Sequence, residues 1–158
     1  MEVSIRRAEE KNVDRIVELL KVIAKEHHKG RPDLFATGRK KYSHRELRGI
    51  LEEPDRVVFV AVDENDYVVG YLFSYIIDQK RNSLFNDIKT LYIDDLCVDE
   101  SCRGMGIGKR LFAHSIEFGK AYGCYNIELN VWSFNEKAIE FYKKLGMDTQ
   151  CYKMEYII

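Results

Sequence analysis

A glycine-rich segment between an apolar run and an amphipathic run constrains the fold more than any other part of the sequence. The segment is Arg103-Gly104-Met105-Gly106-Ile107-Gly108. The apolar run before it, residues 91–98, predicts a strand, and the run after it, to about residue 122, predicts a helix. Such a turn exposes backbone N–H groups at the positive end of the helix dipole, where phosphate binds well. We therefore expect a βα unit that holds a pyrophosphate-bearing ligand.

Composition indicates a globular protein, and we expect neither nucleic acid nor a membrane as a partner. The 158 residues are 46% hydrophobic and 32% charged, which predicts one domain over residues 1–158. The net charge of -1 gives no electrostatic case for binding nucleic acid or an anionic membrane. No apolar stretch approaches the roughly 20 residues that span a bilayer, and the first residues lack the apolar core of a signal peptide. A cytoplasmic location is therefore expected.

The four cysteines, Cys97, Cys102, Cys124 and Cys151, show neither a C-x-x-C pair nor a zinc-finger spacing with histidine. We expect reduced thiols and no metal site. Cys97 lies in the strand before the glycine turn, so a nucleophilic role is an alternative. No histidine nearby in the sequence supports that role.

The remaining elements follow from periodicity and from helix caps. Ser43 and Glu46 have the spacing of a capping box, which predicts a helix through Leu51, and Asn12 is a candidate cap for an earlier helix. Antiparallel hairpins in the first half and βαβ units in the second predict an α/β fold, a mixed sheet flanked by helices. The predicted strands cover residues 3–7, 57–62, 68–77, 91–98, 125–131 and 152–158, and the predicted helices cover residues 12–29, 43–51, 107–122 and 135–145.

Two common phosphate-binding motifs do not fit the glycine segment. A P-loop requires G-x-x-x-x-G-K-[ST], but Arg110 follows Lys109 where a hydroxyl should hold magnesium. A dinucleotide fingerprint requires G-x-G-x-x-G, and Lys109 occupies the position of its third glycine.

A third pattern, [Gln/Arg]-x-x-Gly-x-[Gly/Ala], is satisfied by Arg103, Gly106 and Gly108. A second segment, Asn135 to Met147, fits N-x-x-A-x-x-F-Y-x-x-x-G-[FM]. With these two motifs in order, the chain resembles the GCN5-related N-acetyltransferase (GNAT) superfamily over nearly its whole length. The resemblance implies a mixed, mostly antiparallel sheet of six to seven strands, flanked by about four helices. It also implies acetyl-CoA as co-substrate.

The resemblance assigns roles to particular positions. The strand before the turn splays from its neighbour and pairs with the pantetheine arm, and the turn holds the pyrophosphate. Tyr142 matches the family's general acid, and a backbone N–H near Leu96 would meet the oxyanion. Lys109, Arg110 or Lys144 could contact the 3′-phosphate. The expected coenzyme-binding residues are Leu96, Cys97, Val98, Arg103, Gly104, Met105, Gly106, Ile107, Gly108, Lys109, Asn135 and Tyr142.

A carboxylate is the expected general base. Keeping an amine of pKa about 10.4 neutral at pH 7 costs about 4.6 kcal/mol, so a group that accepts its proton helps the reaction. Asp94 and Asp95 are the candidates. Period-two geometry places them on opposite faces unless a bulge intervenes. Comparison with family members that carry an acid in this strand favours Asp94. Alternatively, both acids are solvated or bind a cationic acceptor without catalysing.

The acceptor is less constrained by the sequence. We expect a small-molecule amine, with a protein N-terminus or lysine as the alternative and a non-catalytic acyl-CoA sensor as a different class. The acceptor side should involve residues 26–42, residues 78–90 and the region after Gly146. The apolar residues 151–158 could form a strand at a sheet edge and pair with a second copy, or be covered within one monomer.

Overall fold

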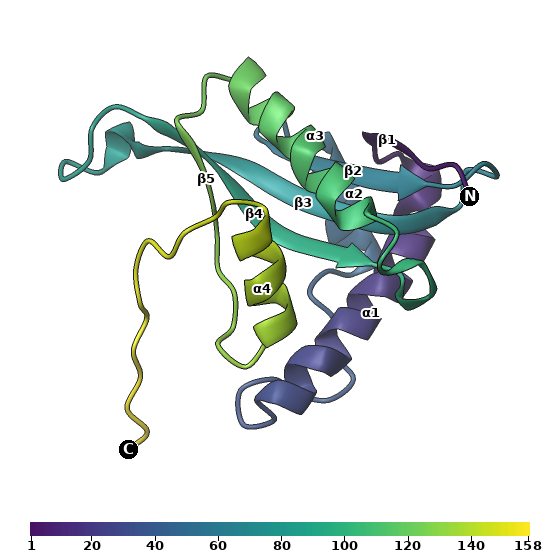
Figure 1. The fold of residues 1–158 in the computed structure, drawn as a ribbon, viewed down its shortest axis with the longest axis horizontal. Helices are drawn as coiled ribbons and strands as arrows, with labels where there is room; N and C mark the ends of the chain where they lie inside the picture. The colour runs from purple at the N-terminus through teal and green to yellow at the C-terminus, as the bar shows by residue number, and fades with distance from the viewer.

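The computed structural model describes residues 1–158 and contains one five-stranded sheet and four α-helices (Figure 1). The strands follow the order β1-β2-β3-β4-β5 across the sheet. The elements are β1 (Ser4–Arg7), α1 (Val13–Gly30), α2 (His44–Glu52), β2 (Arg56–Val62), β3 (Val68–Asp78), β4 (Lys89–Val98), α3 (Ile107–Ala121), β5 (Asn126–Leu129) and α4 (Glu136–Lys144), with single 3-10 turns at Glu10–Asn12, Gln79–Arg81 and Glu100–Cys102.

The predicted mixed sheet is confirmed, but it has fewer strands than expected. The pairs β1–β2, β2–β3 and β3–β4 are antiparallel, and β4–β5 is parallel. The strand predicted at residues 152–158 does not form, so the sheet has five strands rather than six to seven. Residues 151–158, which we call the tail, alternate like a strand but lie against no sheet edge, and a strand needs a partner to satisfy its backbone.

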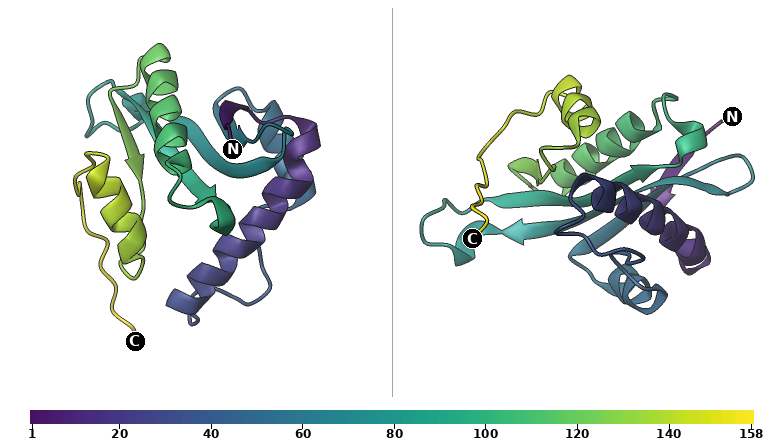
Figure 2. Two further views of the ribbon diagram at one scale, coloured as in Figure 1. Left: turned by 45° about the vertical axis from the view of Figure 1, so that its right-hand side comes forward. Right: turned by 90° about the horizontal axis from the view of Figure 1, so that it is seen from below.

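The helices cover both faces of the sheet (Figure 2). One apolar cluster lies between α1, α2 and the sheet, and includes Ile16, Leu20, Leu47 and Phe73. The other cluster lies between α3 and the opposite face of the sheet, and includes Ile107, Leu111 and Phe112. Together these two cores hold the central strands β2, β3 and β4 rigid, and β4 carries the predicted carboxylates. No helix is long and apolar enough to cross a bilayer.

The helix caps are as predicted for α2 and partly as predicted for α1. The Ser43 side chain accepts from Glu46 N at 3.2 Å, and Ser43 N donates to Glu46 Oε2 at 2.7 Å, which completes the capping box. Asn12 stands at the cap position of α1, but its Oδ1 accepts from Glu9 N at 2.9 Å and from Arg6. A 3-10 turn precedes α1, so Asn12 closes that turn instead of capping the helix.

The parallel pair β4–β5 opens along its length. Its last paired residues are Ile93 and Leu129, whereas β4 stays paired with β3 as far as Val98. The edge of β4 over residues 94–98 therefore faces away from β3 without a strand partner. This is the splay that the family resemblance implied, and it leads directly to the glycine turn.

Candidate active site

The glycine turn presents a row of free backbone N–H groups. Gly104 and Gly106 have φ of +80° and +76°, in the left-handed region, and Gly106 is the N-cap of α3. No backbone or side-chain acceptor in the protein is bonded to the N–H groups of residues 104–109. The first bond closing the helix runs from Arg110 N to Gly106 O at 3.1 Å. The turn can therefore donate several hydrogen bonds to an anion at the positive end of α3.

Other predicted coenzyme-binding residues support this turn and the helix beside it. Arg103 Nε donates to Val98 O at 3.3 Å, which joins the turn to the end of β4. A Cβ on Gly108 would lie 3.1 Å from Phe141 Cζ, so glycine allows α3 and α4 to pack closely. Asn135 caps α4, where its Oδ1 accepts from Ala138 N at 3.1 Å.

A β-bulge places both candidate carboxylates on one face of the sheet. Phe73 pairs with Asp95 and Ser74 pairs with Ile93, so Asp94 has no partner on β3. Tyr42, which stacks on Phe73, bonds to Asp94, and Tyr71 on the same face bonds to Asp95. The sequence could predict only that a bulge was required for this arrangement.

Asp94 is engaged on both carboxylate oxygens. Lys41 Nζ lies 2.9 Å from Oδ1 and also donates to the Asp94 main-chain carbonyl at 2.7 Å. The Tyr42 hydroxyl donates to Oδ2 at 2.5 Å, and burial together with this carboxylate raises the pKa of Tyr42. An ammonium and a hydroxyl thus occupy the two carboxylate oxygens of Asp94 and fix its orientation.

Asp95 is the carboxylate suited to proton transfer near neutral pH. Burial raises its pKa to about 6, while the Lys41 charge and the Tyr71 hydroxyl act in the opposite direction. The Tyr71 hydroxyl donates to Oδ2 at 3.2 Å, and burial raises the pKa of Tyr71 well above its usual value. A base whose pKa lies near the working pH is ionised in a useful fraction of the molecules and still binds the transferred proton well. Both candidates thus remain, with the raised pKa of Asp95 pointing to Asp95 and the resemblance pointing to Asp94.

Tyr142 on α4 keeps its proton at neutral pH. Burial and the nearby charge of Asp95 raise the pKa of its hydroxyl, so the phenol remains a donor. Its ring lies 5.1 Å from Phe141 and 6.5 Å from Phe112, measured between centroids. The Asp95 carboxyl of β4 and the Tyr142 hydroxyl of α4 therefore lie close enough for the charge of one to raise the pKa of the other.

Cys97 is a buried, reduced thiol, as expected. Burial and the Asp95 charge raise its pKa to about 12. The thiol is therefore protonated at neutral pH, which removes the nucleophilic alternative.

The sequence did not point to Lys41, Tyr42 or Tyr71 as contacts of the two aspartates. Lys41 and Tyr42 lie on the connection between α1 and α2, and Tyr71 resembles an ordinary core residue of an alternating strand. Four aromatic rings also link the end of α1 to the β5–α4 connection: His27 stacks on Phe35 at 5.0 Å, Phe35 meets Trp132 edge-on at 5.0 Å, and Trp132 stacks on Phe134 at 6.1 Å. Only the basic and aromatic composition of residues 26–42 pointed to this region.

Of the three cations suggested for the 3′-phosphate, one already has a partner. Lys144 Nζ lies 2.9 Å from Glu140 Oε1 one helical turn away. Lys109 and Arg110 stand in the first turn of α3, next to the free N–H groups. The open edge of β4, the free N–H groups of the turn and these two cations thus follow one another along the chain.

Comparisons with known proteins agree with this arrangement. The family model described as the Acetyltransferase (GNAT) family matches residues 16–147. A crystal structure of the BH1408 protein from Bacillus halodurans superposes with a TM-score of 0.93 at 32% identity, covering 98% of this chain and 99% of that one. The chain belongs to the GNAT family of acetyltransferases.

The curated relatives match shorter segments. Glucosamine 6-phosphate N-acetyltransferase of Trypanosoma brucei brucei is 42% identical over 55 residues, which are 35% of each chain. Thialysine N-epsilon-acetyltransferase of Bos taurus is 34% identical over 82 residues, 50% of this chain and 44% of the relative. The matched segments thus span less than half the length of these relatives.

Proposed function

We propose that this protein transfers the acetyl group of acetyl-CoA to a primary amine by direct attack. The observation that carries the proposal is the pairing of a carboxylate of pKa about 6, Asp95, with a protonated phenol, Tyr142, beside an unpaired strand edge. The free N–H groups of residues 104–109 would hold the coenzyme pyrophosphate, each charge-assisted bond contributing roughly 1.5–3 kcal/mol. The open edge of Leu96, Cys97 and Val98 would pair with the pantetheine arm.

In the proposed reaction the acceptor arrives as an ammonium and must lose a proton before attack. Asp95, directly or through one water, accepts that proton, and the neutral amine attacks the thioester carbonyl. A backbone N–H near Leu96 would stabilise the developing oxyanion. Asp94 would bind and orient the acceptor side of the site together with Lys41 and Tyr42, rather than act as the base.

Collapse of the tetrahedral intermediate releases the coenzyme A thiolate, which Tyr142 protonates, and the nitrogen gives its second proton to the resulting tyrosinate, directly or through water, so that the neutral amide forms and Tyr142 is restored. Replacing Tyr142 by Phe removes the hydroxyl that donates this proton and should lower kcat by about 100- to 10,000-fold, with little change in the Kd for acetyl-CoA. Thiol release and calorimetry measure the two quantities. Tyr122→Phe, on the exposed end of α3, is the matched control. Equal losses of kcat and of acetyl-CoA affinity in Tyr142→Phe would remove Tyr142 from the acid role.

For the acceptor, a small-molecule amine is the proposal we place first. Relatives are named for glucosamine 6-phosphate and thialysine, and a further one, from Escherichia coli, for peptidyl-lysine. Lys41 already pairs with Asp94, so this carboxylate does not by itself select the charge of the acceptor. Acetylation of a protein N-terminus or lysine is the second candidate.

A thiol-release assay over a panel of small amines and lysine peptides tests the proposal. Turnover with a small amine, and little with any peptide, would support a small molecule as the acceptor. Turnover mainly with peptides would favour the second candidate. Binding of acetyl-CoA without turnover on any amine would instead indicate a sensor of acyl-CoA.

A further inference from the structure

Four side chains form a row across the sheet, on the face against which α1 and α2 pack. Register pairs join Arg56 of β2 to Tyr75 of β3, Tyr75 to Tyr92 of β4, and Tyr92 to Glu128 of β5. Residues directly opposite one another in neighbouring strands project to the same face of a sheet. All four are half-buried, so part of each side chain remains open to solvent. We call these four residues the sheet row.

The sheet row lies beside the two candidate carboxylates. Tyr92 precedes Asp94 by two residues on β4, which gives the two side chains the same face. Burial, the neighbouring Tyr75 and the charges of Asp94 and Glu128 raise the pKa of the Tyr92 hydroxyl, so both carboxylates lie near it. At about 3.3 Å per residue and about 4.8 Å between strands, the backbones of Asp95 and Glu128 are on the order of 10 Å apart.

The two charged ends of the sheet row differ in their partners. At the β2 end, Arg56 Nε lies 3.0 Å from Glu53 Oε2 and is compensated. At the β5 end, the bonds to Glu128 come from neutral amides: its Oε1 accepts from Asn126 Nδ2 at 3.0 Å and from Gln150 Nε2 at 2.9 Å. A half-buried carboxylate that is oriented by amides but paired with no cation attracts positive charge.

The two tyrosines add an aromatic surface to this end of the row. The rings of Tyr75 and Tyr92 have centroids 5.1 Å apart, with their planes at 39°. Arg56 Cζ lies 5.6 Å from the centroid of Tyr75, so that ring already has a cation over it. The ring of Tyr92 has none and adjoins Glu128. A cation placed there would be attracted by the ring and by the carboxylate.

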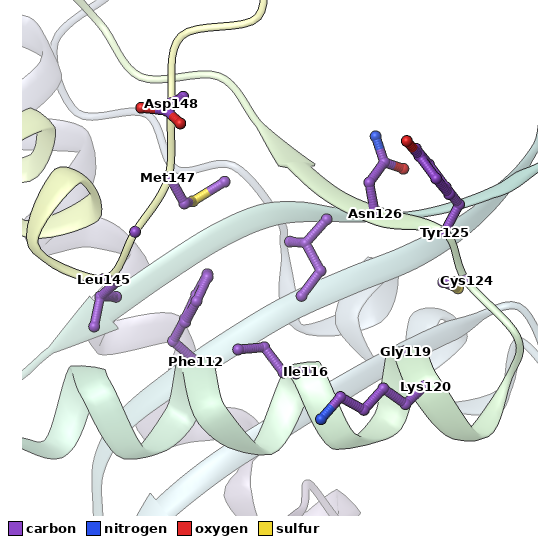
Figure 3. A pocket seen from close by; sticks show the side chains of 12 residues that line it. Phe112, Ile116, Gly119, Lys120, Cys124, Tyr125, Asn126, Leu145, Met147 and Asp148 are labelled. Atoms are coloured by element: carbon purple, nitrogen blue, oxygen red, sulfur yellow. The ribbon is translucent and has the colours of Figure 1, made fainter.

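The opposite face of β5 has a different character. Ile127 adjoins a hollow of about 440 Å³ into which the side chains of Phe112, Ile116 and Met147 point (Figure 3). The lining is mostly apolar, and neither candidate carboxylate belongs to it. A cationic group therefore finds compensation on the face of Glu128 and not in the hollow.

We propose that Tyr92 and Glu128 bind a second cationic group of the acceptor. The inference rests on the proposed function and names its substrate class: a small diamine, with one nitrogen acetylated beside Asp94 and Asp95 and the other held as an ammonium on Glu128. Lys41 already pairs with Asp94, so Glu128 is the carboxylate that selects for positive charge. The separation along the sheet suits two nitrogens that are several bonds apart.

Thiol release from acetyl-CoA compares diamines with monoamines of equal length. The α,ω-diamines of butane and pentane should have kcat/KM values about 10- to 100-fold above those of butylamine and pentylamine, because one charge-assisted bond contributes roughly 1.5–3 kcal/mol. The ω-amino acid of the same length, with a negative far end, should be poorer than the monoamine. Equal kcat/KM for diamine and monoamine would overturn the subsite and leave acetyl transfer to amines intact.

Glu128→Gln tests the residue itself. The amide keeps the size of the side chain and an oxygen for its two donors, but it removes the charge. The advantage of the diamine should disappear, with kcat/KM for the monoamine unchanged. Glu64→Gln is the matched control, because Glu64 is exposed in the turn between β2 and β3, at the other end of that hairpin. A diamine preference that survives Glu128→Gln would overturn the proposal.

Two variants of Tyr92 separate its ring from its hydroxyl. Tyr92→Phe keeps the aromatic face and should keep the diamine preference, whereas Tyr92→Leu should lose part of it. Equal losses in both would remove the ring from the subsite. Circular dichroism reports folding, and Glu128→Gln at its half-exposed position provides the test even if Tyr92→Leu does not fold.

Calorimetry measures the subsite without turnover. Diaminopentane should bind the wild-type protein about 10- to 100-fold more tightly than Glu128→Gln. Equal binding by the two proteins, or none by the wild type, would overturn the subsite whether or not any amine is acetylated. The expected difference in Kd without thiol release from any amine would reject acetyl transfer and support the cation site alone.

Discussion

At the residue scale, neighbouring aspartates have different surroundings although they are adjacent in sequence. Asp94 contacts Lys41 and Tyr42, whereas Asp95 contacts Tyr71 and has a pKa that burial raises to about 6. The bulge brings both to one face, and burial then separates their chemistry. A cationic neighbour favours the ionised form, whereas burial favours the neutral form.

Asp95→Asn tests the assignment of the base. In the wild-type enzyme kcat/KM should fall about tenfold per pH unit below pH 6, because the base must be ionised and its pKa is about 6. In Asp95→Asn this acidic limb should disappear and the remaining rate should be low. The pH–rate profile measures both. Asp94→Asn is the comparison, and an acidic limb lost there but kept in Asp95→Asn would reassign the base to Asp94.

The same variant should change stability in the opposite direction to activity. The pKa of Asp95 is raised from 3.8 to about 6, so the folded protein binds the proton more tightly than the unfolded chain. Ionising Asp95 therefore lowers stability as pH rises from about 4 to 6, by up to about 3 kcal/mol. At pH 7 Asp95→Asn should unfold at higher urea than wild type, and below pH 4 the difference should vanish.

The sequence points to candidate site residues more readily than to the contacts that surround them. Asp94, Asp95, Tyr142 and the glycines are recognisable because their chemistry belongs to a local motif. The contact of Lys41 with Asp94 depends on how a connection folds over the sheet, 53 residues away in sequence. Local patterns do not contain that information, so the different surroundings of Asp94 and Asp95 could not be predicted before the fold was known.

At the element scale, α3 has a glycine in the left-handed region at each end. Gly106 precedes its first turn with φ of +76°, and Gly123 follows its last turn with φ of +71°. Neither would bring a Cβ within 4 Å of another residue. The two positions therefore impose equal backbone strain on a substitution, but only Gly106 lies where the coenzyme is proposed to bind.

Gly106→Ala should weaken acetyl-CoA binding by about 10- to 100-fold, the loss of one or two charge-assisted bonds at the turn. It should also lower the unfolding free energy by about 1–2 kcal/mol, because an L-residue is strained at this φ. Gly123→Ala should show the same loss of stability with no change in Kd. Calorimetry and urea unfolding measure the two effects, and equal loss of affinity in both variants would remove the turn from the coenzyme site.

Element boundaries were predictable wherever a local cap or breaker marks them. The capping box of Ser43 and Glu46 located the start of α2, and Gly123 located the end of α3. The tail was predicted as a strand from the same alternation, yet a strand forms only where an edge accepts it. Whether an edge is available is a property of the assembled chain.

At the scale of the whole molecule, the aromatic chain from His27 to Phe134 joins the two halves of the fold. It connects α1, on one face of the sheet, to the β5–α4 connection beyond the splay. Gly30 permits this approach, because a Cβ there would lie 2.2 Å from the Phe134 ring.

Gly30→Ala should displace Phe134 and lower the unfolding free energy by about 1–3 kcal/mol through overpacking. Trp132, the single tryptophan of the chain, stacks on Phe134, so its emission should shift. Gly49→Ala in α2 is the control, since nothing lies within 4 Å of that Cβ and alanine favours a helix. Unchanged tryptophan emission in Gly30→Ala would show that the ring is not held against α1.

Topology was predictable because the order of elements and the two motifs agree with one family fold. The pairing of strands, the opening between β4 and β5 and the two cores all follow from that order. The number of strands did not follow, because residues 151–158 do not pair with the sheet.

Lys41 and Tyr42 lie on an irregular connection between α1 and α2, apart from the elements proposed to hold the coenzyme. The proposed donor side is built from a strand end and a helix start. The groups proposed to meet an incoming amine lie on a segment that can lengthen, shorten or change its residues without disturbing the sheet. Descendants of one ancestor could therefore diversify in what they modify while inheriting a single means of holding the activated acyl group.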